Sequence, residues 1–143
     1  MQLLIFCILR VLSIDSGVQL EQIMNQLTKR TGVARIIAAT RYSIEGLMLA
    51  IRTETAFSQE TYLFLFLVPL ALLFGETDVE RVLLIAVLIL VLVTELLNTA
   101  IEAVVDRIGT EFHPLSKQAK DLGSAAVFMT LSLALITWLL ILW

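Results

Sequence analysis

Four polar residues recur along one stripe of an otherwise apolar segment. Glu95, Asn98, Glu102 and Asp106 follow one another at intervals of three, four and four residues. On a helix this spacing confines their side chains to an arc of about 80°. Carboxylates in such an arc can ligate a hard cation such as Mg²⁺ or take a proton from a hydroxyl nucleophile. The same stripe is also compatible with satisfied polar packing between two helices.

Lysines and further acids surround this stripe in the sequence. Lys117, Lys120 and Asp121 follow it, with His113 nearby, and Glu54 lies well before it. Lysine beside carboxylates suits a phosphate-handling site. The same lysines would equally be the positive residues of a cytoplasmic loop. The sequence has no GxxxxGK[ST] loop, no GxGxxG and no HRD segment, so phosphate transfer would occur outside the soluble kinase folds.

Composition places the chain in a membrane. Of its 143 residues, 59% are hydrophobic and 16% charged, against about 45–50% and 25% in soluble domains. With a mean hydropathy of +0.93, so much apolar surface cannot all be buried in water. Most soluble enzymes, nucleic-acid binders and disordered tails are therefore excluded. A net charge of -3 indicates no polyanion partner, and the single Cys7 excludes an intrachain disulfide.

Three apolar stretches predict membrane-spanning helices, at about 57–74, 80–108 and 118–142. Pro69 falls inside the first, where neighbouring helices can satisfy the freed carbonyl. The second is expected to be about 45 Å long, which exceeds a hydrocarbon core of about 30 Å. One of its ends must therefore project from the core.

Capping signals bound these helices. Thr77 and Glu80 form a capping-box pattern before the second span. Gly109 is placed to end that helix in a left-handed cap. The third helix is expected to begin near Pro114, because proline is favoured in a first helical turn.

A different pattern precedes the first span. Over about residues 33–55, apolar side chains gather in an arc of about 120°, which predicts an amphipathic helix on the membrane surface. Lysine and arginine are concentrated before the first span and between the second and third. The positive-inside rule therefore predicts a cytoplasmic N-terminus and an external C-terminus.

The first residues fit this scheme poorly. The stretch MQLLIFCILRVLS is too short to span a membrane and contains Arg10. We expect residues 1–28 to be an extension of a single membrane domain at 29–143. Met24 is the expected native start, and a short surface helix is the alternative.

The acidic stripe and the segment after it carry a specific resemblance. ELLNTAIEAVVDRIG and HPLSKQAKDLGSAAV resemble the signature region of the prokaryotic diacylglycerol kinases, which are small three-span enzymes. The resemblance runs from about residue 31 to 143 and includes RIIAATRYSIEGL and TETAFSQE. It implies an all-α homotrimeric bundle in the bacterial inner membrane, with active sites shared between subunits. It also implies transfer of the γ-phosphate of MgATP to diacylglycerol.

The resemblance implies roles for individual residues. Glu95 would be the general base, Glu54 and Glu102 would hold Mg²⁺, and Asn98 would support them. The implied ATP contacts are Arg35, Tyr42, Glu54, Glu102, Glu111, Phe112, His113, Lys120 and Asp121. The implied lipid contacts are Arg35, Ala39, Thr40, Arg41, Tyr42, Ser43, Ile44, Met48, Leu49, Ala50, Ile51, Ala56, Phe57, Ser58, Gln59, Glu60, Glu95 and Ser124.

Four positions depart from the family pattern. Ala38, Ile44 and Met48 stand where lysine, tryptophan and arginine are common, and Ser58 replaces an arginine. These changes leave the acidic residues in place but alter side chains that are expected near the lipid headgroup. Undecaprenol kinases, which look similar, are the alternative reading. EAVVDRIG and GSAAV favour the diacylglycerol branch.

Two readings without a kinase also account for part of the pattern. A small proton-coupled transporter would explain Glu95 but not Glu54 or the Lys120–Asp121 pair. A membrane scaffold without catalysis would not explain the acidic stripe.

Overall fold

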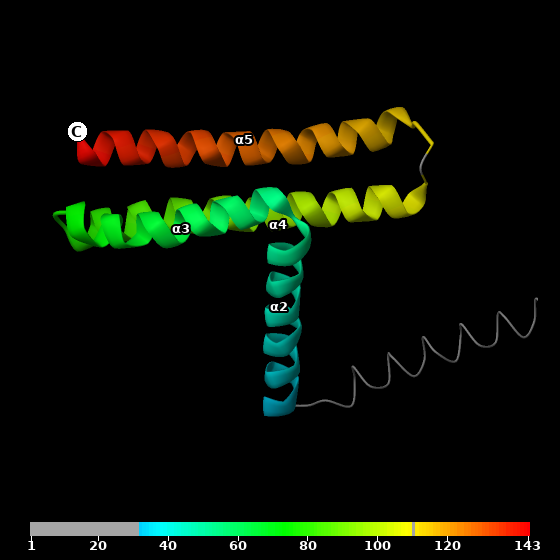
Figure 1. Cartoon of the computed structure of the whole chain (residues 1–143), viewed down its shortest axis with the longest axis horizontal. Coiled ribbons are helices and arrows are strands. Elements are labelled where there is room, and N and C mark those ends of the chain that lie inside the picture. Colours follow the sequence, from blue (N-terminus) through cyan, green and yellow to red (C-terminus); the bar gives the residue numbers. More distant parts are fainter. Residues whose placement is uncertain (1–31, 110) are drawn as a thin grey trace, which may run out of the picture. The chain divides into compact units, whose positions relative to one another are not determined.

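The computed structural model describes residues 32–109 and 111–143. In these ranges the chain forms four helices: α2 (Val33–Thr53), α3 (Thr55–Phe74), α4 (Asp78–Ile108) and α5 (Pro114–Leu142), as Figure 1 shows. The described residues contain no strand, so the all-α prediction is confirmed. The expectation of a start at Met24, with an extension over 1–28, lies outside the described residues.

Helices α3, α4 and α5 are each long and apolar enough to cross a membrane, which confirms the three predicted spans. They begin at residues 55, 78 and 114, a few residues before the apolar stretches that predicted them. The residues added at the three starts include the polar Thr55, Asp78 and Ser116, and polar residues add nothing to an apolar run even when they are helical. Conversely, α2 ends at Thr53 rather than at about 55, because Glu54 adopts an extended conformation with φ -106° and ψ 110°.

The caps show why α4 and α5 begin where they do. The Thr77 hydroxyl accepts a hydrogen bond from the Glu80 amide at 3.3 Å, and a Glu80 carboxylate oxygen accepts one from the Thr77 amide. This is the predicted capping box. At α5, His113 Nδ1 accepts from the Leu115 amide at 3.2 Å and Pro114 opens the helix, as expected. The left-handed cap predicted at Gly109 is wrong, because its φ of 169° is extended backbone that any residue adopts.

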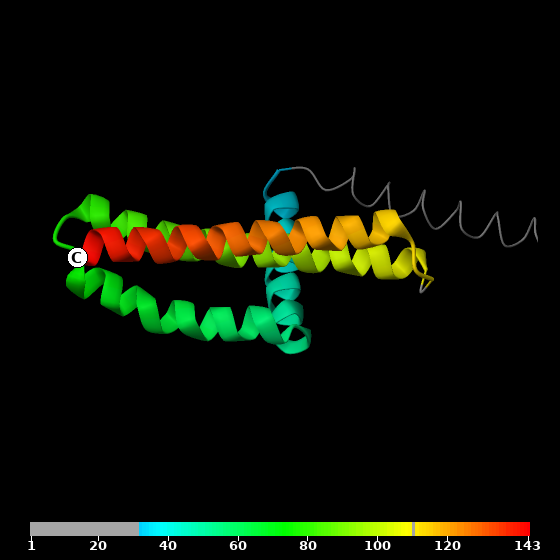
Figure 2. The same cartoon turned by 90° about the horizontal axis from the view of Figure 1, so that it is seen from above.

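Helix α4 lies in the middle of the spanning helices and packs against both α3 and α5 (Figures 1 and 2). Leu84 is completely buried, and Val87, Val91 and Ala134 form a small apolar cluster with Trp138 packed against it. The Trp138 indole N–H donates to the Leu84 carbonyl at 3.3 Å, which ties α5 to α4. Most other apolar side chains of these helices are exposed, as expected for surfaces that face lipid.

The chain divides into two units within α2, after Glu45. In the described part of the first unit, Gly32 has a φ of +66° and its carbonyl accepts from the Arg35 amide, which begins the helix. The apolar side chains of Val33, Ile36 and Ile37 are each more than 60% exposed. This part of α2 therefore presents an apolar surface to its surroundings.

The Trp138–Leu84 tie generates a stability prediction. Trp138→Phe keeps an aromatic ring in the cluster but removes the N–H donor. Because interhelical hydrogen bonds in membranes contribute about 0.6 kcal/mol on average and at most about 1.7 kcal/mol, we expect a loss in that range. Denaturant titration in mixed micelles measures it. Trp143→Phe is the control, since Trp143 is fully exposed, and an equal loss in the control would contradict the prediction.

Candidate active site

Glu95 is the starting point of the site. It lies well inside α4 and is only 7% exposed, whereas the other buried side chains of the described core are apolar. The carboxylates of Glu54, Glu60 and Glu102 lie close enough to interact with it electrostatically. A group of acids at membrane depth is costly unless a proton or a cation compensates it. The arrangement therefore suits proton transfer beside a bound cation.

One turn beyond Glu95, two members of the stripe are bonded to each other. Asn98 Nδ2 donates to Glu102 Oε1 at 3.2 Å, and both side chains are partly buried. The other end of the amide, Asn98 Oδ1, is buried without a hydrogen-bond partner. The bond holds Glu102 by one oxygen and leaves its second oxygen available to a ligand.

Glu54 is carried by the corner between α2 and α3. Its amide still bonds the Ala50 carbonyl at 2.9 Å, although its own backbone is extended. The Ser58 hydroxyl donates to two carbonyl oxygens of this corner, that of Ile51 at 2.7 Å and that of Glu54 at 2.9 Å. The Ser58 hydroxyl therefore stabilises the backbone that positions Glu54.

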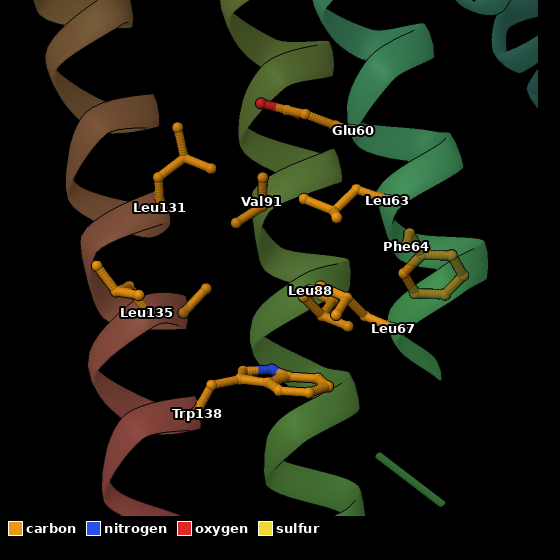
Figure 3. A pocket seen from close by; sticks show the side chains of 10 residues that line it. Glu60, Leu63, Phe64, Leu67, Leu88, Val91, Leu131, Leu135 and Trp138 are labelled. Atoms are coloured by element: carbon orange, nitrogen blue, oxygen red, sulfur yellow. The ribbon is translucent and has the colours of Figure 1, made fainter. Parts of the chain in front are cut away.

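Glu60 lines a cavity of about 310 Å³ whose other lining residues are apolar or aromatic. Figure 3 shows Glu60 reaching from α3 toward α4, above Leu63 and Val91, with Trp138 on α5 at the other end. Its Oε2 atom is buried without a hydrogen-bond partner. The cavity thus combines an acyl-sized apolar space with one polar end on the side of Glu95.

Both lysines near the start of α5 form ion pairs with aspartates. Lys120 Nζ on α5 contacts Asp106 Oδ1 on α4 at 2.6 Å, and Lys117 pairs with Asp121 one turn along α5. Lys120 and Asp121 are adjacent in sequence but are bonded to other partners. In the loop before α5, Glu111 and Phe112 are exposed, and His113 is occupied as a helix cap. Together with Ile108 and Ser116, these three residues line a second hollow of mixed polar and apolar character.

The donor set fits magnesium. Among residues 32–109 and 111–143, no three His, Cys, Asp or Glu side chains lie together as a complete metal-binding group. Mg²⁺ does not need one, because it keeps several waters and binds through one or two carboxylates plus substrate phosphates. The carboxylate oxygens of Glu54 and Glu102, both partly buried near Glu95, match that requirement.

Comparison with known proteins decides the family. A family model described as prokaryotic diacylglycerol kinase matches residues 41–142. The chain belongs to the prokaryotic diacylglycerol kinase family. This confirms the resemblance drawn from the signature segments.

Three relatives show the extent of the likeness to this family. The diacylglycerol kinase of Haemophilus influenzae is 50% identical over 110 residues, which cover 77% of this chain and 93% of that protein. The diacylglycerol kinase of Pseudomonas aeruginosa is 51% identical over 113 residues, 79% of this chain and 92% of that protein. The diacylglycerol kinase of Helicobacter pylori strain 26695 is 44% identical over 113 residues, which cover 79% of this chain and 85% of that protein.

Most of the remaining residues that the diacylglycerol kinase resemblance implies lie on α2, whereas Ala56, Phe57 and Gln59 lie on α3 and Ser124 lies on α5. Arg35 and the range 39–44 belong to the first unit, where all of them are exposed. Arg41 is already engaged by Glu45 at 2.7 Å. In the second unit Met48, Leu49 and Ile51 are exposed and Ala50 is buried.

One contact at the site was not predicted from the sequence. Gly123 of α5 packs so closely on Asn98 that a Cβ atom there would lie 2.2 Å from Asn98 Oδ1. The spacing of Ala119 and Gly123 signals a close helix approach in general. It does not identify which residue of α4 is approached.

Proposed function

We propose that this chain transfers the γ-phosphate of ATP to the primary hydroxyl of diacylglycerol, giving phosphatidic acid and ADP. The observation that carries the proposal is the buried Glu95 beside the Asn98–Glu102 pair on one membrane helix. Family membership and relatives of about 50% identity that are named diacylglycerol kinase support the acceptor.

The proton and the phosphoryl group move in one balanced step. Glu95 accepts the proton of the primary hydroxyl as that oxygen attacks the γ-phosphorus. A new O–P bond forms, and the bond from the γ-phosphorus to its bridging oxygen breaks, so ADP leaves with the electron pair. Such transfers depend mainly on positioning and on neutralising charge. Burial of Glu95 in addition excludes water as a competing acceptor of the phosphoryl group.

Glu54 and Glu102 are the residues that would hold Mg²⁺. When bound, the ion neutralises charge on the phosphates of ATP. Glu102 follows Glu95 by seven residues, which is about 10 Å along the helix axis. ATP can then approach from the end of α4 while the lipid hydroxyl reaches Glu95 at greater depth. Asn98 lies between the two and fixes the orientation of Glu102 by donating to Oε1.

The remaining contacts divide between the two substrates. The nucleotide would be bound by Lys120, Asp121, the segment 111–113, Arg35 and Tyr42. The lipid would be bound by the ranges 39–44, 48–51 and 56–60, by Ser124, and by Arg35, Tyr42 and Glu95. The apolar cavity that ends at Glu60 supports this division, because an acyl chain fits its lining.

The same proposal includes the setting of the enzyme. The exposed apolar side chains at the start of α2 support a helix that lies on the membrane surface. The distribution of lysine and arginine supports a cytoplasmic N-terminus and an external C-terminus in a bacterial inner membrane. Family membership supports a homotrimer with active sites shared between subunits.

The first prediction concerns the acids of α4. Glu95→Gln removes the proton acceptor, which is worth about 10²–10⁴-fold in rate. Glu102→Gln is expected to weaken binding of MgATP strongly. Phosphate transfer by purified protein in lipid micelles measures both. Glu76→Gln is the control, because this exposed acid lies in the turn before α4. Normal turnover by both site variants, with intact assembly on size-exclusion chromatography, would refute the assignment.

The second prediction concerns the acceptor. Labelled phosphate from MgATP should be transferred mainly to diacylglycerol when diacylglycerol and undecaprenol are offered separately. Preference for undecaprenol would keep the mechanism and overturn the acceptor. No transfer to either lipid from folded protein would overturn the kinase assignment.

The third prediction concerns the metal. Chelation with EDTA should abolish transfer, and added Mg²⁺ should restore it. Glu54→Gln should raise the Mg²⁺ concentration needed for half-maximal activity by at least the roughly 10–100-fold that outer ligand contacts are worth. Titration of activity with Mg²⁺ at saturating ATP measures this shift. An unchanged midpoint would remove Glu54 from the metal site.

A further inference from the structure

Helices α4 and α5 approach each other closely at Gly123. This residue is buried, and a Cβ atom there would lie 2.2 Å from Asn98 Oδ1 and 3.3 Å from Asn98 Cγ. Such distances are shorter than van der Waals contact allows. Because glycine has no side chain, the Asn98 amide can occupy this position.

The Asn98 amide links this contact to the acidic site. Nδ2 donates to Glu102 Oε1 at 3.2 Å, and Oδ1 is buried without a partner on the side of Gly123. A carboxylate can only accept, so the amide must present its nitrogen to Glu102. Because the amide group is planar and rigid, a constraint on its oxygen end also fixes its nitrogen end.

We propose that Gly123 is a positioning residue for Glu102. By leaving room for Asn98 Oδ1, it keeps the Asn98 amide in the orientation that holds Glu102 Oε1 and directs the other carboxylate oxygen toward MgATP. The inference rests on the proposed function in one respect, namely that Glu102 acts at the metal–nucleotide complex. It adds a residue of α5 that touches neither substrate.

The crowding is confined to a movable group. The third nearest atom to a Cβ at position 123 is Asn98 Cα, at an ordinary 3.8 Å. An alanine can therefore be accommodated against the backbone of α4 once the Asn98 side chain rotates away. Gly123→Ala should consequently fold and assemble, but with the Asn98–Glu102 hydrogen bond broken.

The test is a double-mutant cycle on the full chain in lipid micelles. It compares wild type, Gly123→Ala, Asn98→Ala and the double variant by kcat, by the KM for MgATP and for diacylglycerol, and by thermal unfolding. Gly123→Ala should raise the KM for MgATP about tenfold or more, as losing a residue that orients a metal ligand does. The KM for diacylglycerol and the melting temperature should barely change. The double variant should be no worse than Asn98→Ala alone.

Several outcomes overturn the inference. An additive loss in the double variant would show that Gly123 acts independently of Asn98. A lowered melting temperature with an unchanged KM for MgATP would make Gly123 a packing residue only. Gly46→Ala controls for helix propensity, because no atom lies within 4 Å of its added Cβ. Glu102→Gln separates the role of Gly123 from the proposed function. If Glu102→Gln leaves the KM for MgATP unchanged, the proposed function of Glu102 fails. If Glu102→Gln raises that KM but Gly123→Ala does not, only the role of Gly123 is refuted.

Discussion

A carboxylate inside an apolar helix constrains the rest of this molecule. Glu95 can be held at membrane depth only if it faces protein rather than lipid, because an acid exposed to hydrocarbon is expensive. Helix α4, which carries Glu95, accordingly lies between α3 and α5 and contributes half of the buried apolar side chains of the described residues. The remaining acids approach it from three places: farther along α4, from α3, and from the corner before α3.

That corner shows how local backbone chemistry serves the site. Glu54 is extended, yet it is bounded by two helices that leave little freedom on either side. A single hydroxyl, that of Ser58 on α3, contacts the carbonyls of Ile51 in α2 and of Glu54 at the break. The backbone that presents the Glu54 carboxylate is therefore held by hydrogen bonds from within the same corner.

Hydrophobic periodicity and capping chemistry predicted the helices well, since both are local properties of the sequence. The Thr77 capping box and the opening proline of α5 both followed from residues within one turn of each other. The Gly109 cap failed because glycine permits a left-handed conformation without requiring it. Pairings between helices were beyond local rules: neither the Lys120–Asp106 contact nor the Gly123–Asn98 contact follows from spacing along one helix.

Two lysines near the start of α5 already have aspartate partners. Lys117 is paired with Asp121, and Lys120 is paired with Asp106. An anion that approaches Lys120 must therefore compete with the Asp106 carboxylate for the same ammonium group. Because Asp106 lies on α4 and Lys120 on α5, exchange of this partner also removes a contact between the two helices.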